Sequence, residues 1–171
     1  HGAVMVLDLD NFKPLNDAQG HLVGDLLLME AATRLNGCLR SMDTVARFGG
    51  DEFVVLLSDL DPDRADENSQ AGTIAEKIRA SLSEPYRLIA KREGKADAAI
   101  EHHCSASIGV ALFVGTDANR DDVLKWADAA MYEAKKAGRN SVRFFDPESG
   151  PRVIDAPPAA VAARAPTLAT A

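Results

Sequence analysis

The stretch "RFGGDEF", residues 47–53, places two glycines and two acidic residues between two apolar segments. The flanking segments, 44–48 and 52–58, have the length and apolar content of β-strands, so the sequence predicts a hairpin that turns at Gly49 and Gly50. Two interpretations of this turn are open. It is either a plain hairpin turn with solvated acids, or a turn that holds a metal ion and lets a phosphate approach a backbone without Cβ atoms.

Predicted strands and helices are interspersed along the rest of the chain. Further strands are predicted at residues 3–9, 86–91, 103–113 and 141–145, and amphipathic helices at 21–40, 72–83 and 119–138. Residues 10–20 are rich in turn formers and leave room for a short helix, and residues 92–101 form a polar connection. We therefore expect a mixed α/β (α+β) domain with helices packed on a sheet.

Composition excludes several classes of protein. The 171 residues suit one domain, and an apolar fraction of 46% is enough to build its core. A net charge of −7 argues against a protein that grips nucleic acid by its phosphates, but it permits a small anionic ligand. No apolar run approaches the roughly 18 residues of a membrane span. Cys38 and Cys104 lack CxxC partners and are expected to be reduced thiols.

Acidic residues also end the first predicted strand, as Asp8 and Asp10. If this strand lies beside the hairpin, its end converges with Asp51 and Glu52. Carboxylates from two adjacent strands, with an exposed strand-end carbonyl, form an oxygen site that suits Mg²⁺. The alternative is a solvated strand end without a ligand.

Basic residues that could hold a phosphate come from other segments. Lys135 and Arg139 lie one helical turn apart at the end of the last predicted helix, and Lys13 follows the acidic strand end. A bound triphosphate would need such cations. The alternative for the helix end is favourable charge at a C-terminus.

Four segments in series resemble the GGDEF domain of diguanylate cyclases. They are "LDLDNFKPLNDAQGHLVGD" (7–25), "RFGGDEF" (47–53), "SASIGVALF" (105–113) and "ADAAMYEAKKAGRN" (127–140). The resemblance covers about residues 3–146, and several motifs in the right order are far more specific than any one of them. It implies a nucleotidyl-cyclase or palm-like fold, with a mostly antiparallel central sheet flanked by helices. We expect this domain to occupy residues 1–147, followed by an Ala/Pro-rich disordered tail or linker at 148–171.

The resemblance implies an enzyme that condenses two GTP molecules into cyclic di-GMP and releases two pyrophosphates. The 3′-OH of one GTP attacks the α-phosphorus of the other, so two domains must face each other as a homodimer. The implied cofactor is Mg²⁺ (or Mn²⁺). Its ligands would be Asp8, the Leu9 carbonyl, Asp51, which is also the base for the 3′-OH, and Glu52.

Other site residues follow from the same resemblance. The substrate contacts would be Asn16 and Asp25 with guanine, His21 with a further part of the substrate, Gly49 and Gly50 with the phosphates, and Lys135 and Arg139 with the terminal phosphates. Lys13 would stabilise charge on the phosphates in the transition state.

A product-inhibition site is implied by "RSMD", residues 40–43, which has the family's R-x-x-D pattern. Arg40 would stack on or fork to cyclic di-GMP, and Asp43 would accept from guanine. Arg79 on the next helix is a candidate for an additional arginine. The alternative is an exposed ion pair at a helix end.

The sequence also departs from the family pattern. The "D-x-L-T-G-L-x-N-R" segment that usually precedes the first strand is missing, and neither a sensory domain nor an EAL motif is present. We therefore expect an N-terminally truncated, cytoplasmic fragment without membrane or nucleic-acid contacts, whose parent protein could be membrane-anchored. Two other functions stay open: a catalytically silent module of a larger, GGDEF-EAL-like protein that binds GTP or cyclic di-GMP, and a dimerisation domain without nucleotide binding.

Overall fold

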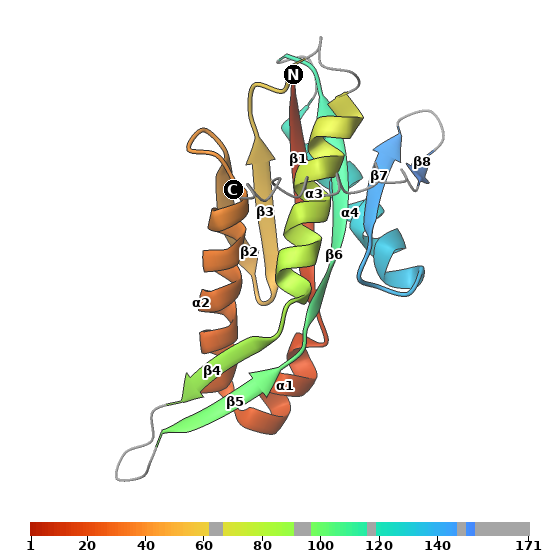
Figure 1. Cartoon of the computed structure of the whole chain (residues 1–171). Helices are drawn as coiled ribbons and strands as arrows, with labels where there is room; N and C mark the ends of the chain where they lie inside the picture. Colours follow the sequence, from red (N-terminus) through yellow and green to blue (C-terminus); the bar gives the residue numbers. More distant parts are fainter. Residues whose placement is uncertain (62–66, 91–96, 116–118, 147–149, 153–171) are drawn as a thin grey trace, which may run out of the picture.

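The central sheet of the computed structural model has six strands in the order β2-β3-β1-β6-β7-β8 (Figure 1). The structure describes residues 1–61, 67–90, 97–115, 119–146 and 150–152. The strands are β1 (Gly2–Asp10), β2 (Thr44–Gly49), β3 (Glu52–Leu57), β6 (Ser105–Phe113), β7 (Val142–Asp146) and β8 (Gly150–Arg152). All neighbours are antiparallel except β6 and β7. The predicted mostly antiparallel sheet is confirmed.

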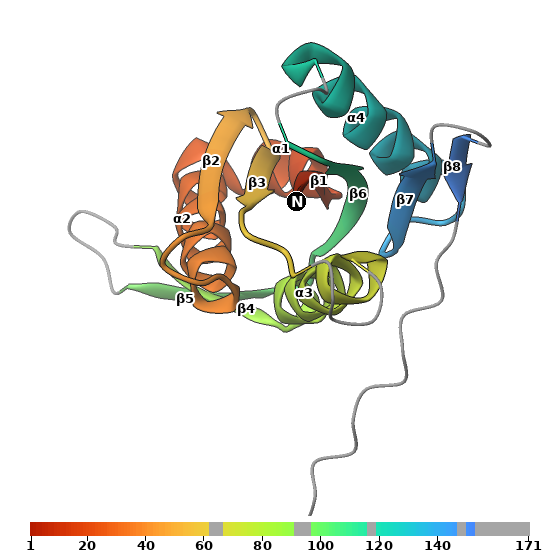
Figure 2. The same ribbon diagram turned by 90° about the horizontal axis from the view of Figure 1, so that it is seen from above.

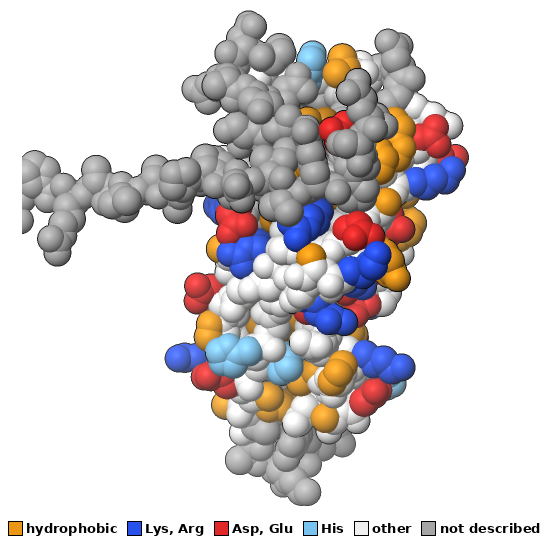
Figure 3. All heavy atoms as spheres, turned by 90° about the vertical axis from the view of Figure 1, so that its right-hand side faces the viewer, with side chains coloured by type: hydrophobic (Ala, Val, Ile, Leu, Met, Phe, Trp, Pro, Cys, Tyr) orange, Lys and Arg blue, Asp and Glu red, His pale blue; other side chains and the backbone are white. Residues whose placement is uncertain are grey.

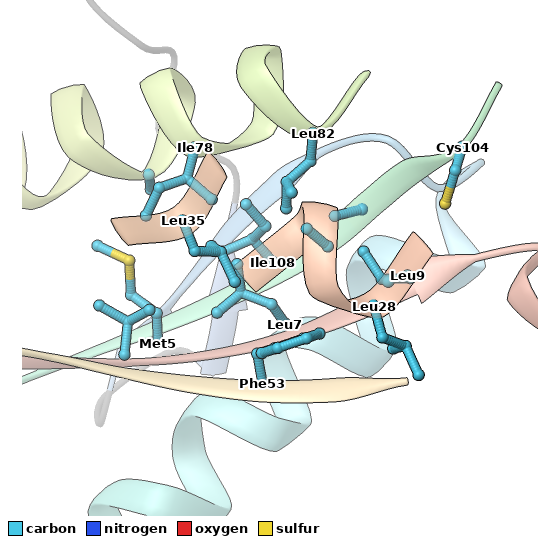
Figure 4. Packing of buried hydrophobic residues seen from close by; sticks show 14 of the residues in the cluster. Met5, Leu7, Leu9, Leu28, Leu35, Phe53, Ile78, Leu82, Cys104 and Ile108 are labelled. Atoms are coloured by element: carbon cyan, nitrogen blue, oxygen red, sulfur yellow. The ribbon is translucent and has the colours of Figure 1, made fainter. Parts of the chain in front are cut away.

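Helices cover both faces of this sheet, so β1 is buried from two sides (Figure 2). On one face lie α2 (His21–Cys38) and α3 (Glu67–Ser83), and on the other lies α4 (Arg120–Lys136). Successive strand residues point to opposite faces, so the odd-numbered side chains of β1 meet α2 and α3. Figure 4 shows Leu35, Ile78 and Leu82 reaching from these helices towards the sheet residues Met5, Leu7 and Ile108.

A separate two-stranded sheet, β4 (Tyr86–Ala90) with β5 (Ala98–His102), lies beyond one end of the central sheet. The sequence predicts a polar connection at residues 92–101, and for β5 this prediction is wrong. Residues 98–102 contain two alanines and two polar residues, so local propensity for a strand is weak. The strand exists because it pairs with β4, which places Ile100 opposite Leu88.

Other boundaries also differ from those predicted. The turn-rich segment contains the short helix for which the sequence left room, α1 (Phe12–Gln19), whereas α3 begins before the predicted residue 72. β8 lies in the segment assigned to the tail, while residues 153–171 lie outside the described residues, so the tail stays a prediction. Within the described ranges, each helix is too short or too polar to cross a membrane.

Candidate active site

The acidic end of β1 lies against the hairpin that β2 and β3 form. Asp8 is directly opposite Glu52 in the antiparallel ladder, so the two side chains lie on the same face of the sheet. The next residue, Leu9, donates its backbone N–H to the carbonyl oxygen of Asp51 at 3.2 Å. Asp51 and Glu52 are both half-buried. The structure therefore brings the four proposed metal-binding residues to one edge of the sheet.

The hairpin turn depends on its second glycine. Gly50 has a φ of +48°, in the left-handed region that glycine adopts without strain. The guanidinium of Arg47 closes the turn, because its Nε donates to the Gly50 carbonyl oxygen at 2.9 Å. A Cβ atom on Gly49 or Gly50 would meet nothing within 4 Å. The outer side of the turn is therefore open to a ligand.

A lysine from α4 reaches the same edge. The helix begins where Asn119 Oδ1 accepts from the Asp121 N–H at 3.2 Å, and its last turn contains Lys135. The Lys135 Nζ lies 2.6 Å from Asp8 Oδ2. Burial raises the pKa of Asp8, the hydrogen bond from Lys135 opposes this rise, and the neighbouring Asp51 adds to it. A buried carboxyl group among other acids favours a cation, and Lys135 supplies one.

The donor set fits a divalent metal that also binds substrate. Among the described residues, no group of three or more His, Cys, Asp or Glu side chains could hold a metal ion by itself. Mg²⁺ rarely uses an all-protein cage, and it completes its shell with water and substrate phosphates. The Asp8 carboxyl group already pairs with an ammonium group, and Asp51 and Glu52 lie beside it. These oxygens suit such a shared site.

The two predicted guanine-contacting residues, Asn16 and Asp25, lie on α1 and α2. Asn16 Nδ2 lies 3.0 Å from His21 Nδ1, and the other amide atom, Oδ1, is buried without a hydrogen-bond partner among the described residues. Asp25 is exposed on the next turn of α2 and lines a groove of about 470 Å³ that extends to Arg47 and Phe53. This groove connects Asp25 to the hairpin.

The two remaining cations are both exposed. Lys13 lies in the first turn of α1, and Arg139 lies in the loop after α4 with a φ of +65°. Lys135, in the last turn of α4, and Arg139, in the loop that follows, thus lie close together in sequence on the segment that leads to β7.

The R-x-x-D segment forms the turn between α2 and β2. The Arg40 N–H donates to Asp43 Oδ2 at 2.9 Å, and the Ser58 N–H donates to Asp43 Oδ1 at 3.4 Å. The structure does not bring Arg79 to this turn, because its guanidinium pairs with Glu76 on its own helix and with Asn140. The cation of α3 that reaches the end of α2 is Lys77, whose Nζ donates to the Cys38 carbonyl oxygen at 3.2 Å.

One acidic residue at the end of β1, Asp10, is not among the metal ligands that the family resemblance implies. Asp10 is 2% exposed and accepts hydrogen bonds from Ser105 and Ser107 of β6. A signal existed: "DLD" and "SAS" both place polar residues two apart in otherwise apolar strands, so each pair shares one face of its strand. The register that places Ser105 opposite Asp10 could not be read from the sequence.

The surface beside α4 is mixed in charge. On the face where β7 and β8 lie, Lys and Arg side chains alternate with Asp and Glu side chains (Figure 3). Among the described residues that this view shows, the cations do not form a continuous basic surface of the kind that tracks a nucleic-acid backbone.

Comparison with known proteins identifies the family. The family model described as "Diguanylate cyclase, GGDEF domain" matches residues 1–141. The bifunctional diguanylate cyclase/cyclic di-GMP phosphodiesterase MucR of Pseudomonas aeruginosa is 45% identical over 144 residues, which are 84% of this chain and 19% of MucR. The chain thus spans about a fifth of that relative's length.

Solved structures agree with this match. The GGDEF domain of TpbB from Pseudomonas aeruginosa is 39% identical, with a TM-score of 0.68 over 84% of this chain and 81% of that one. The GGDEF domain of DgcB from Caulobacter crescentus, in complex with c-di-GMP, is 31% identical, with a TM-score of 0.66 over 84% and 77%. The chain belongs to the GGDEF family of diguanylate cyclase domains.

Proposed function

We propose that this domain is a diguanylate cyclase that condenses two GTP molecules into cyclic di-GMP and two pyrophosphates. The observation that carries the proposal is the arrangement of groups at one edge of the sheet. Asp8 and Glu52 lie opposite each other there, and the Lys135 ammonium group contacts the Asp8 carboxyl group. The backbone carbonyl oxygen of Asp51 accepts from the Leu9 N–H at the same edge. Carboxylates for a metal and a cation for a phosphate are what phosphoryl-transfer sites bring together. Family membership and similarity to TpbB support the same activity.

The base of GTP would lie in the groove at Asp25. Guanine presents N1–H and N2–H₂ donors, and the Asp25 carboxylate can accept from both. The buried, unpartnered Oδ1 of Asn16 offers a further acceptor after a small side-chain movement, and His21 contacts the same amide group. Adenine lacks this pair of donors, so ATP is disfavoured.

The triphosphate would extend from the groove to the hairpin turn. The open side of Gly49 and Gly50 lets phosphate oxygens approach the backbone. Lys135 and Arg139 would pair with the terminal phosphates, and the exposed Lys13 would stabilise charge that develops in the transition state.

Diguanylate cyclases use divalent metal ions, and we infer Mg²⁺ or Mn²⁺ at this site. Asp8, Asp51, Glu52 and the Leu9 carbonyl would hold it. When bound, the metal neutralises the triphosphate and lowers the pKa of the attacking 3′-OH. Asp51 would take the proton from that hydroxyl, because it lies at the turn and is half-buried, whereas Asp8 is buried and pairs with Lys135.

The reaction also requires a second copy of the chain. Each site holds one GTP, so the 3′-OH of one nucleotide meets the α-phosphorus of the other only when two domains face each other. The rate of product formation should therefore rise more than linearly with protein concentration. A homodimer is the active form under this proposal.

Product analysis tests the activity. The purified chain, at high concentration with GTP and Mg²⁺, should form cyclic di-GMP, and Asp51→Asn should reduce the rate by at least about 100-fold. Asp121→Asn is the matched control, because Asp121 is an exposed acid in the first turn of α4. Absence of product after forced dimerisation would contradict the proposal. GTP binding without product would instead indicate a regulatory module.

We further propose that Arg40 and Asp43 bind the product. Arg40 is exposed at a turn that Asp43 already orders, and Lys77 places a second cation at the same end of α2. Calorimetry with cyclic di-GMP should detect binding that Arg40→Ala removes while GTP binding persists. Equal binding by wild-type protein and Arg40→Ala would exclude this site.

A further inference from the structure

The carboxyl group of Asp10 is the centre of a buried network that the proposed mechanism does not use. Asp10 is 2% exposed. Its Oδ1 accepts from Ser107 Oγ at 2.7 Å, and its Oδ2 accepts from Ser105 Oγ at 2.6 Å and from the backbone N–H of Asn140 at 3.1 Å. The two serines belong to β6, which neighbours β1. Asn140 belongs to the loop between α4 and β7, far away in sequence.

This loop has an unusual backbone conformation. Gly138, Arg139 and Asn140 have successive φ values of +114°, +65° and +44°. Positive φ is uncommon for residues other than glycine, and here two such residues follow one another. Conformations of this kind persist only where surrounding groups hold them. A backbone N–H can act only as a donor, and the acceptor that the Asn140 N–H meets is Asp10 Oδ2. This hydrogen bond is one such restraint on the loop.

The loop is also held from the opposite side. Asn140 Oδ1 accepts from Arg79 Nη1 at 2.7 Å and from Ser83 Oγ at 3.0 Å, both on α3. Arg79 is fixed in turn by its ion pair with Glu76. Asn140 is therefore clamped between the end of β1, through its backbone, and α3, through its side chain. These contacts also explain why Arg79 does not reach the turn at Arg40.

The clamped loop carries Arg139, one of the proposed phosphate contacts, and directly follows the turn of α4 that carries the other, Lys135. The Arg139 N–H donates to the Ala134 carbonyl oxygen at 3.0 Å, so Arg139 is tied back to the last turn of α4, which contains Lys135. The direction in which Arg139 leaves the loop depends on its own left-handed backbone and on that of the next residue, Asn140, which Asp10 and Arg79 hold. We propose that Asp10 is a positioning residue for the terminal phosphates of GTP, acting through Asn140 on Arg139 and Lys135. This inference rests on the proposed function and deepens it.

The test compares two nucleotides that differ in their terminal phosphates. One is 3′-deoxy-GTP, which lacks the attacking hydroxyl, and the other is GMP. Asp10→Ala should weaken binding of 3′-deoxy-GTP about tenfold or more and change GMP affinity less than about twofold, because only the triphosphate meets the loop. Ser107→Ala is the matched control, since its bond is to the other carboxyl oxygen; it should leave both affinities unchanged.

A second variant and a second readout guard against loss of folding. Asp10→Asn keeps the side-chain shape but replaces charge-assisted hydrogen bonds by weaker neutral ones, so it should give a smaller, phosphate-selective loss. Amide hydrogen exchange at Asn140 should be faster in both Asp10 variants than in wild type.

Three outcomes are distinct. A phosphate-selective loss, with faster exchange at Asn140, supports the inference. Unchanged 3′-deoxy-GTP binding in Asp10→Ala, or equal losses for both nucleotides, overturns it while the proposed function stands. Failure of the wild-type chain to bind either nucleotide overturns the proposed function and the inference with it.

Discussion

Lys135 Nζ lies 2.6 Å from Asp8 Oδ2, which joins the last turn of α4 to the end of β1. A protein cation thus pairs with the carboxyl group that we propose as a metal ligand. Lys135 and a metal ion would compete for this oxygen, so the binding of one weakens the binding of the other. Binding of metal and triphosphate together would release Lys135 from Asp8 and transfer it to the phosphates.

This competition predicts opposite effects of one substitution. Lys135→Gln should strengthen binding of Mn²⁺ alone and weaken binding of 3′-deoxy-GTP, each by about tenfold, because it removes a competitor from Asp8 and a partner from the phosphates. Paramagnetic resonance of free Mn²⁺ and calorimetry measure the two effects. Lys136→Gln is the control, since Lys136 pairs with Glu133, three residues before it on α4, and not with Asp8. A loss of Mn²⁺ affinity in Lys135→Gln would contradict the competition.

The contact between β6 and α4 predicts a strict requirement at Gly109. A Cβ atom there would overlap the backbone of α4 at Ala127 and Met131, which cannot move aside like a side chain. Gly109→Ala should therefore lower the free energy of unfolding by about 3 kcal/mol or more. Gly37→Ala, a matched change in α2 with nothing within 4 Å, should raise it by about 0.5 kcal/mol. Urea unfolding measures both, and equal values would contradict this packing.

Local signals predicted the hairpin and the helices well. Gly49, Gly50 and the flanking apolar runs predicted the turn, and the spacing of apolar residues predicted α2 and α4. The facing of Asp8 and Glu52 followed once β1 and β3 were neighbours. These features depend on periodicity and turn chemistry, which a single segment contains.

Long-range polar contacts could not be predicted in the same way. The hydrogen bond between Asp10 and Asn140 joins residues near opposite ends of the domain's sequence. The partner of Arg79, Asn140, is in a loop whose conformation no sequence pattern predicts. β5 depends on pairing rather than on propensity. The helix alone makes Arg79 a candidate for the product site, whereas the direction of its side chain is set by Glu76 and Asn140.

The contacts of Arg34, a charged residue on α2, predict that it has a structural role. It pairs with Glu30 and lies over the ring of Tyr86, with Cζ 3.9 Å from the ring centroid. Its guanidinium donates to the carbonyl oxygens of Ser81 (3.0 Å), Glu84 (2.7 Å) and Pro85 (2.8 Å). Arg34→Ala should therefore lower the free energy of unfolding by about 2–3 kcal/mol.

Two controls separate these contacts from charge alone. Glu30→Ala removes the ion pair but none of the carbonyl contacts, and should cost less than about 1 kcal/mol. Arg34→Lys keeps the charge but lacks the planar fork, so it should recover only part of the loss. Full recovery with lysine, measured by urea unfolding, would contradict a role for the fork.

The two cysteines should differ sharply in reactivity. Burial raises the pKa of Cys104 to about 12, with further contributions from Asp10, Asp51 and Asp8. The thiolate is the reactive form, so native Cys104 should resist iodoacetamide at pH 8, whereas the half-buried Cys38 should react. Mass spectrometry of native and urea-unfolded protein measures both sites. Cys38→Ser protein should therefore remain unlabelled until it unfolds, and rapid labelling of native Cys104 would contradict its burial.

The environment of His102 predicts that the folded domain loses stability in mildly acidic solution. Burial and the neighbouring His103 lower its pKa, and its Nε2 is buried without a hydrogen-bond partner among the described residues. The folded state therefore favours neutral His102. Below about pH 6.5 the unfolded chain binds the proton more readily than the folded one, so this contribution to stability is present at neutral pH and is lost as pH falls.

Nuclear magnetic resonance of the histidine ring protons should give His102 a pKa below the ordinary value of about 6.5. Urea unfolding should show a smaller decrease in stability between neutral and mildly acidic pH for His102→Phe than for wild type. His103→Ala is the control, because removing that like charge should raise the pKa of His102 without restoring the ordinary value, since burial remains the larger cause. An ordinary or raised pKa for His102 in the folded protein would contradict the environment that β4 and β5 create around it.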